Sequence, residues 1–162
     1  MRHFAHFDAR RVPSPCFVVD EVALEENLQL LAQVQRESGA KILLALKAFS
    51  MFSMAPLVRR HLAGTCASGL HEARLGREEY GGEVHTFCAA FTEPDLREVL
   101  AISDHVVFNS FGRLERFRPL LEAARAARPG LQLGMRINPE HSEGTVPLYD
   151  PCAPCSRLGV PL

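Results

Sequence analysis

An alternation of short apolar runs with helical segments constrains the fold of this chain more than any other feature. Apolar runs rich in β-forming residues occupy residues 41–47, 65–68, 84–88, 105–109 and 131–138. Segments with helical spacing lie between them, at 53–62, 70–80, 93–102 and 112–127. A repeat of roughly 20–25 residues has room for a strand, a helix and two tight loops. The pattern therefore predicts βα units, whose strands should be parallel.

The first helix is marked by its ends. Asp20 is a suitable N-cap, acidic residues follow it in the first turns, and Leu24, Leu28 and Leu31 share one face. The pair 38–39, Ser-Gly, should end this helix. Before it, residues 15–20 are predicted to form a strand that has no evident partner in the chain.

Composition excludes several classes of function. The chain has 162 residues, 47% of them hydrophobic, and a net charge of -1, so we expect one domain that does not bind nucleic acid. It shows no apolar signal region near Met1 and no apolar stretch that could span a membrane, so we expect a soluble cytoplasmic protein. Its partners should be small molecules or proteins.

The cysteines do not form a recognisable framework. Five cysteines, an odd number, argue for free thiols in a reducing compartment. Cys152 and Cys155 have CxxC spacing, but a second ligand pair and a strand-to-helix junction are both missing around them. Two loop thiols are the favoured interpretation.

Two parallel architectures compete. A doubly wound sheet normally carries a glycine-rich phosphate turn after its first strand, and no such motif occurs here. A (β/α)8 barrel carries its chemistry where strands end, and five polar residues end the predicted strands: Lys47, Ser68, Asn109, Arg136 and Asn138. The barrel is favoured. About five βα units are present, whereas a complete barrel needs roughly 200 residues or more, so we expect the first part of a larger barrel.

Lys47 ends an apolar run, KILLALKAF, and has two interpretations. Its stem can pack on apolar neighbours while the ammonium group reaches water. Alternatively, desolvation lowers the pKa of such an amine and leaves a nucleophile that forms Schiff bases. Position alone does not separate these alternatives.

Five segments of the chain together form a recognisable set of motifs. They read ILLALKAFSM, GTCASGLHEARLGREEYGGEVH, DHVVFNSFGRLERF, GMRINPEHSE and LYDPCAPCSRLGV. In this order and spacing they resemble the carboxynorspermidine (carboxyspermidine) decarboxylases. That family belongs to the fold-type III, alanine racemase-like enzymes that use pyridoxal 5'-phosphate, together with ornithine and diaminopimelate decarboxylases. The resemblance runs from about residue 13 to residue 160.

This resemblance implies a cofactor, a reaction and a partner. The cofactor would be pyridoxal 5'-phosphate, joined to Lys47 as a Schiff base that the substrate amine displaces. Loss of CO2 from carboxynorspermidine or carboxyspermidine would give norspermidine or spermidine, with Lys47 also moving protons. Full-length relatives would be homodimers.

Other site residues follow by the same comparison. Arg136 matches an arginine near the cofactor's phenolic oxygen, with a surface ion pair as the alternative. Ser68 and Glu72 fall at the mouth of the second strand, although Glu72 is equally suited to a helix first turn. His71 is set aside as a local hydrogen-bonding residue. Three further residues either line the substrate channel or cap loops: Asn109, His141 and Ser142.

Two departures limit the function that the resemblance implies. Cys155 stands where the family has Gly, which is costly if the backbone φ is positive. The chain stops at Leu162, before the stacking histidine, the phosphate loop, the acid facing the pyridine nitrogen and the carboxyl-terminal β-domain of relatives. We therefore expect residues 1–20 to be a segment whose strand pairs with that missing domain, and 21–162 to be the first part of the cofactor-binding barrel.

The expected activity of the 162 residues alone is accordingly low or nil. Three hypotheses stay open: part of a polyamine-forming decarboxylase; an inactive remnant or a cofactor-binding module without catalysis; or another decarboxylase or racemase of the same fold.

Overall fold

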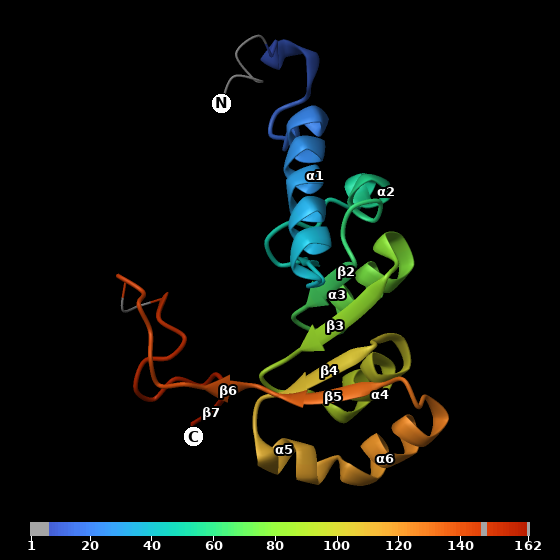
Figure 1. Cartoon of the computed structure of the whole chain (residues 1–162), viewed down its shortest axis with the longest axis vertical. Helices are drawn as coiled ribbons and strands as arrows, with labels where there is room; N and C mark the ends of the chain where they lie inside the picture. Colours follow the sequence, from blue (N-terminus) through green and yellow to red (C-terminus); the bar gives the residue numbers. More distant parts are fainter. Residues whose placement is uncertain (1–6, 147–148, 162) are drawn as a thin grey trace.

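A parallel five-stranded sheet forms the centre of the molecule (Figure 1). The structure is a computed structural model that describes residues 7–146 and 149–161. The strands stand side by side in chain order, β1-β2-β3-β4-β5. Their bounds are Leu43–Ala45 for β1, Gly64–Ala67 for β2, Glu83–Phe87 for β3, His105–Phe108 for β4 and Gln132–Met135 for β5.

Two helices precede the sheet, η1 (Ala9–Arg11) and α1 (Glu21–Ser38). The helices that connect its strands are η2 (Phe52–Met54), α2 (Ala55–Val58), α3 (Leu70–Leu75), η3 (Gly76–Tyr80), α4 (Glu93–Ile102), α5 (Phe111–Arg116) and α6 (Arg118–Ala127). Two further short strands, β6 (Ile137–Asn138) and β7 (Val160–Pro161), pair in parallel beyond the main sheet. Among the described residues, none of these helices has the length and apolar character that crossing a membrane requires.

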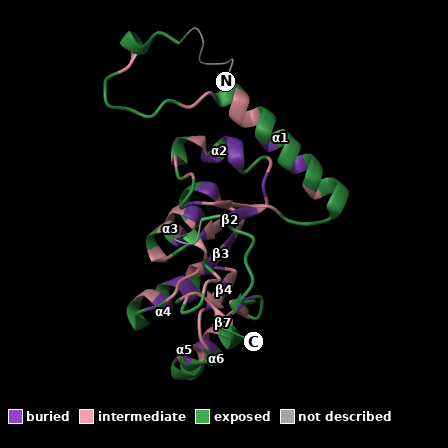
Figure 2. Ribbon diagram, turned by 90° about the vertical axis from the view of Figure 1, so that its left-hand side faces the viewer, coloured by how far each residue is buried: buried purple, intermediate pink, exposed green. Residues whose placement is uncertain are grey.

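The order of the strands decides between the two parallel architectures. In a doubly wound sheet, strands are added first toward one edge and then toward the other, so the strand order departs from the chain order. Here each strand pairs in parallel with the next one in the sequence. Figure 2 shows α2, α3 and α4 on the same side of the sheet. The prediction of a partial (β/α)8 barrel with about five βα units is confirmed.

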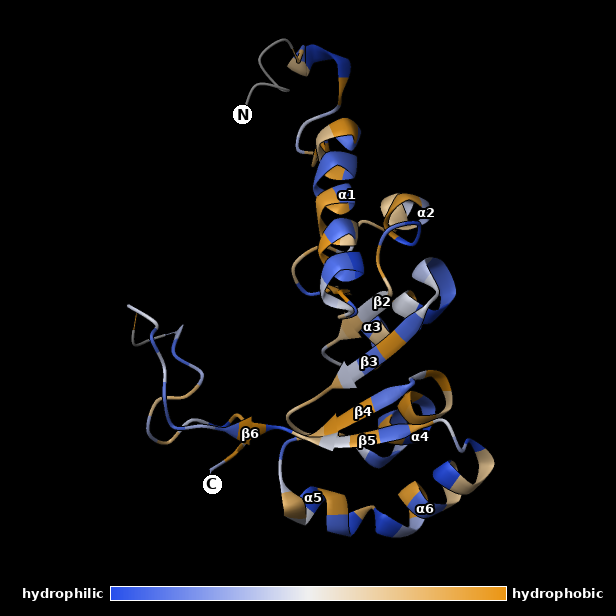
Figure 3. Ribbon diagram, viewed as in Figure 1, coloured by the Kyte–Doolittle hydropathy of each residue, from blue (hydrophilic) through white to orange (hydrophobic). Residues whose placement is uncertain are grey.

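The core lies between the sheet and the helices behind it. Val106 and Phe108 of β4 are buried against Leu96 and Val99 of α4 and against Leu121 of α6. Apolar and polar bands alternate along α6, as expected for a helix with one face in the core (Figure 3). Burial of such side chains stabilises the fold by about 1.5–3 kcal/mol each.

The first helix has the predicted ends. The Asp20 side chain accepts a hydrogen bond from the backbone N–H of Ala23 at 3.0 Å, and Gly39 ends α1 in the left-handed region with φ 74°. The Gln35 side chain then ties α1 to the rest, donating to the His61 carbonyl at 2.7 Å and accepting from the Ile42 N–H at 2.8 Å.

Residues 15–20 do not form the predicted strand. They have no regular secondary structure, and Phe17 is 94% exposed. A β-strand requires a hydrogen-bonded neighbour, and none of the described residues pairs with this segment. The segment therefore has no strand partner among the described residues, as expected, and its pairing with a further domain stays a prediction.

Two predicted elements are broken by local chemistry. The predicted helix 112–127 divides at Phe117, because Pro119 has no N–H to donate to the carbonyl of Glu115. The predicted strand 131–138 divides at Arg136, where its pairing changes from β4 to β7. Boundaries elsewhere differ from the predictions by a few residues, as at β1, which ends before Lys47.

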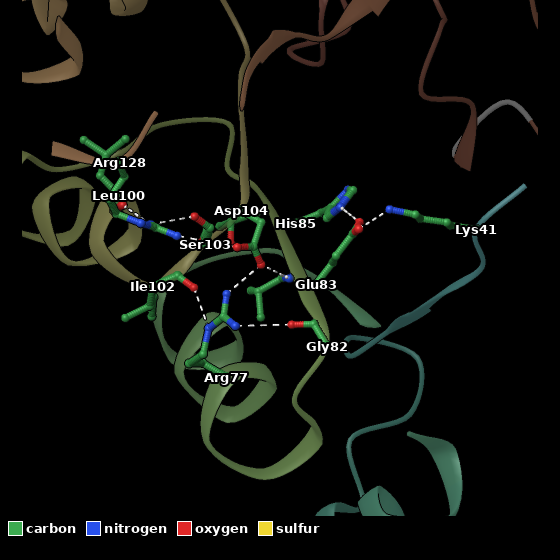
Figure 4. Close-up of polar contacts among 12 residues, drawn as sticks. Lys41, Arg77, Gly82, Glu83, His85, Leu100, Ile102, Ser103, Asp104 and Arg128 are labelled. Carbon is green, nitrogen blue, oxygen red and sulfur yellow. Dashed lines mark hydrogen bonds and ion pairs between the residues drawn. The ribbon is translucent and has the colours of Figure 1, made fainter. Parts of the chain in front are cut away.

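Asp104 joins the amino-terminal ends of the strands to the helices (Figure 4). One carboxylate oxygen accepts hydrogen bonds from Arg77 Nη2 at 2.6 Å and from the Val84 N–H at 2.9 Å. Its other oxygen accepts from Arg128 Nη2 at 3.5 Å. Arg128 Nη1 also donates to the carbonyls of Leu100 and Ser103, at 2.6 and 2.9 Å. One carboxylate thus connects β3, η3 and the end of α6.

We expect Asp104→Asn to lower the free energy of unfolding by about 1–3 kcal/mol, because it replaces charge-assisted hydrogen bonds at a partly exposed site. Urea unfolding followed by circular dichroism measures the change. Glu115→Gln is the matched control, since its ion pair with Arg118 lies on an exposed helix surface. Equal effects of the two substitutions would contradict the structural role of Asp104.

Candidate active site

The two faces of the sheet carry different side chains. Alternation along a strand sends successive side chains to opposite faces, and Val84, Thr86, Val106 and Phe108 are buried on the face that meets the helices. The alternate residues form what we call the inner face, which includes seven partly exposed residues: Ala45, Cys66, Glu83, His85, Phe87, His105 and Val107. In a closed barrel this face lines the interior.

Lys47 stands at the carboxyl-terminal end of the inner face. Backbone N–H groups of Ala48 and Phe49 donate to the Ala45 carbonyl at 2.9 and 3.2 Å, so a tight turn follows β1 and contains Lys47. Leu46 is buried toward the helices, at 1% exposure. Lys47, the next residue, is exposed. The Schiff-base interpretation assumed that Lys47 is desolvated. Among the described residues Lys47 is instead exposed.

The chain contains only two lysines, and their environments differ. The Lys41 ammonium is paired with the Glu83 carboxylate. Lys47 has no hydrogen-bond or ion-pair partner among residues 7–146 and 149–161. An unpartnered primary amine is free to react with a carbonyl compound.

The pKa of the Cys66 thiol depends on the charges of Lys47 and Glu72. Burial raises the pKa of the Cys66 thiol, the Lys47 ammonium lowers it, and the Glu72 carboxylate raises it. Both charges thus act on a side chain of β2 whose backbone is paired with Ala45. Lys47, Cys66 and Glu72 form one electrostatic neighbourhood.

A second cation lies at the same edge of the sheet. The Arg136 N–H donates to the Phe108 carbonyl at 2.8 Å, which fixes its backbone beside β4. Its guanidinium lies over the Phe87 ring, 4.8 Å from the centroid. Within the described part of the chain Arg136 has no carboxylate partner, so the predicted alternative of a surface ion pair is not found there. The ring holds the cation in place without neutralising it.

Ser68 and Glu72 are brought together by a local contact. The Ser68 backbone N–H donates to Glu72 Oε2 at 2.7 Å, across the start of α3. A carboxylate in the first helical turn commonly accepts from the backbone in this way and interacts favourably with the helix dipole. Glu72 therefore has the structural role that its sequence position also allowed, and Ser68 is exposed beside it.

The remaining loop candidates have structural partners. The Asn109 side chain donates to the Arg157 carbonyl and accepts from the Gly159 N–H, both at 2.8 Å. Ser142 Oγ accepts from the Gly144 N–H at 3.1 Å, and His141 is exposed beside Glu143. These contacts support loop capping for all three candidates. His71, which we set aside, is exposed on α3.

Cys155 has the strained backbone that its position suggested. Its φ is 65°, in the left-handed region that favours glycine. Cys152 and Cys155 are free thiols, and Asp150 Oδ1 accepts a hydrogen bond from the Cys152 N–H at 2.8 Å. The geometry supports the interpretation of this CxxC as part of a loop.

A cavity lies beside the Lys47 turn. It measures about 460 Å³ and is lined by residues 17–19 and 48–53, so it begins at the residue that follows Lys47.

Sequence reasoning did not find Cys66 and Phe87 as members of the inner face. The period-two pattern of residues 83–87, in which Glu, His and Phe alternate with Val and Thr, was the available signal.

The chain is similar in sequence to several known decarboxylases. No protein-family model matches the chain. It is 41% identical over 149 residues to carboxyaminopropylagmatine decarboxylase of Synechocystis sp., an alignment that covers 92% of this chain and 37% of that protein. It is 38% identical to carboxynorspermidine/carboxyspermidine decarboxylase of Herminiimonas arsenicoxydans, with 91% and 39% covered.

A solved structure agrees with these relatives. The crystal structure of Campylobacter jejuni carboxynorspermidine decarboxylase complexed with norspermidine matches with a TM-score of 0.75 and 33% identity. The match covers 93% of this chain and 36% of that one. The chain thus spans somewhat more than a third of the length of these relatives. By sequence and by fold, it is homologous over nearly all its residues to the amino-terminal part of the carboxynorspermidine and carboxyspermidine decarboxylases.

Proposed function

We propose that Lys47 is the cofactor lysine of a pyridoxal 5'-phosphate-dependent decarboxylase that acts on a carboxylated polyamine. The observation that carries the proposal is the placement of Lys47, an unpartnered amine at the carboxyl-terminal end of the inner face. In parallel βα folds of this kind, catalytic groups sit at that end of the strands. The named relatives are all decarboxylases.

The residues present suit the cofactor. An aldehyde needs a free primary amine, which Lys47 offers, and an anionic oxygen needs a fixed cation, which Arg136 over Phe87 offers. In this proposal Ser68 and Glu72 stand beside the cofactor, with Glu72 still capping α3. When bound, pyridoxal 5'-phosphate supplies an electron sink for the negative charge that loss of CO2 leaves behind.

The chain's own residues then orient and move protons. With the cofactor bound, Lys47 Nζ would accept and donate protons at the substrate amine. Arg136 keeps a positive charge at a fixed distance from Phe87, so charge on the bound anion meets a preorganised partner. Cys66 lies on the inner face within reach of the Lys47 charge.

The substrate class rests on the names of relatives. These proteins act on carboxynorspermidine, carboxyspermidine or carboxyaminopropylagmatine, which share an amino acid head and a cationic tail. We propose this class for the protein that includes the chain, without a choice among its members. A homodimeric assembly, a cytoplasmic location and the division at residue 20 stay predictions.

A cofactor-binding module without catalysis is the second candidate. The observation that favours it is the exposure of Lys47, which leaves this residue in contact with water. Binding and turnover are therefore measured separately, as trapping of the cofactor and as CO2 release from each of the three carboxylated amines. Cofactor trapping without CO2 release in the complete protein supports this second candidate.

We expect Lys47 to form the adduct when the 162-residue chain is incubated with pyridoxal 5'-phosphate and reduced with borohydride. Peptide mass mapping locates the modified residue. Lys47→Arg should lower incorporation by about tenfold or more, because arginine keeps the charge but offers no amine for a Schiff base. Circular dichroism checks that the variant is folded.

Lys41→Arg is the matched control. It removes the only other lysine and retains a cation for Glu83. Incorporation should stay within about twofold of the parent chain. An adduct found mainly on Lys41 or on the amino terminus would disprove the assignment of Lys47.

We expect Lys47→Met to slow alkylation of Cys66 near pH 8. Removing the ammonium takes away the group that lowers the Cys66 pKa, so less thiolate is present. Glu72→Gln should have the opposite effect, since it removes a charge that raises this pKa. Isotope-coded iodoacetamide followed by mass spectrometry gives the rate at each cysteine, with exposed Cys16 as the internal reference. Unchanged rates in both variants would show that neither charge lies near Cys66.

A further inference from the structure

Three metal-ligating side chains meet near the amino-terminal end of the inner face. One imidazole nitrogen from each of His85 and His105 and one carboxylate oxygen of Glu83 all lie within 4.8 Å of one another. The two imidazole rings are stacked, with centroids 3.9 Å apart. Neither the proposed decarboxylation nor the Asp104 contacts use these three side chains.

Strand pairing holds the three residues together. His85 and His105 are directly opposed partners in the parallel ladder of β3 and β4, and Glu83 precedes His85 by two residues. A period of two places Glu83 and His85 on the same face of β3. The cluster therefore stands on the paired strands of the sheet, which position ligands more rigidly than loops do.

The Glu83 carboxylate is already oriented (Figure 4). His85 Nε2 lies 3.0 Å from Glu83 Oε2, and Lys41 pairs with Oε1. Because an ionised carboxylate can only accept, His85 Nε2 carries the proton in this contact. A metal ion would replace that proton between the same two atoms, while Lys41 continues to hold the other oxygen. Such outer contacts keep ligands in position in known metal sites.

The chemistry of the donors selects the kind of ion. Two imidazoles and one carboxylate form the ligand set of several catalytic zinc sites, in which solvent takes the fourth position. His85 and Glu83 are about a quarter exposed, at 26% and 30% of the side chain, so water reaches the cluster. Hard cations such as Mg²⁺ prefer oxygen ligands alone.

We propose that Glu83, His85 and His105 bind one divalent transition-metal ion of the zinc class. Bond lengths of about 2.0–2.2 Å require the three atoms to draw closer than in the metal-free arrangement, a change that side-chain rotation on a fixed sheet permits. His85 is paired with Cys66, and Cys66 is paired with Ala45, two residues before Lys47. The proposed ion thus lies roughly one layer of side chains below the Lys47 site, about 7 Å along the strands.

The site is tested by calorimetry with zinc chloride alone, on the untagged 162-residue chain after treatment with a chelator. We expect one zinc ion per chain to bind with a dissociation constant in the micromolar range. His105→Ala and Glu83→Gln should each weaken binding by about tenfold or more, because each removes a ligand. The visible spectrum of a cobalt-loaded sample should change in the same variants.

Two controls address other zinc ligands in the chain. His141→Ala alters an exposed histidine that stands 3.7 Å from Glu143, another His–Glu pair without a second histidine. Cys152→Ser combined with Cys155→Ser removes the CxxC thiols. Both variants should bind zinc within about twofold of the parent chain.

Three results of the zinc titrations would contradict the proposed site. No saturable zinc binding, undiminished binding by His105→Ala, or loss of binding with the cysteine pair each overturns the proposal. Circular dichroism checks the fold of every variant. If His105→Ala fails to fold, Glu83→Gln decides, because the amide keeps the size of the carboxylate but loses its charge and one of its two acceptor oxygens. Lys47→Arg should bind zinc normally, so failure of the proposed function would leave this test unaffected.

Discussion

The parallel register of five neighbouring strands is the constraint on which the rest of the structure depends. It aligns the period-two alternation of each strand with that of the next, so that one face of the sheet is apolar and buried and the other carries the chemistry. A slip by one residue would exchange the two faces. The close approach of β2 and β3 fixes this register further, because a Cβ on Gly64 would lie 2.0 Å from the Glu83 carbonyl oxygen.

The two ends of the inner face differ in how their charges are paired. At the carboxyl-terminal end, Lys47 and Arg136 are cations without carboxylate partners among the described residues, and such an edge attracts anionic groups. At the amino-terminal end, Glu83 lies between Lys41 and His85. The same sheet thus presents an edge suited to an anionic cofactor and a compact group of metal ligands.

Sequence reasoning worked where the cause is local. The ends of α1 follow from Asp20 and Gly39, whose preferences act within one helical turn. The family resemblance was carried by short motifs and is confirmed by the relatives. The helix break at Phe117 also has a local cause, Pro119. The helical spacing of apolar residues across 112–127 nevertheless led us to predict one continuous helix. Residues 15–20 form no strand among the described residues, because a strand depends on a hydrogen-bonded partner that its own residues do not supply.

The amino-acid sequence by itself determined the βα repeat, the position of Lys47 at the end of a strand and the relation to a decarboxylase family. Each of these depends on residue order over short distances. The three-dimensional fold determined which side chains meet. His85 and His105 are 20 residues apart, and Arg136 reaches Phe87 from the link between β5 and β6, because strand pairing brings distant segments into register. Glu72 likewise shows its capping role through the contact with Ser68. Contacts of this kind depend on the summed packing of the whole sheet, which no single segment encodes.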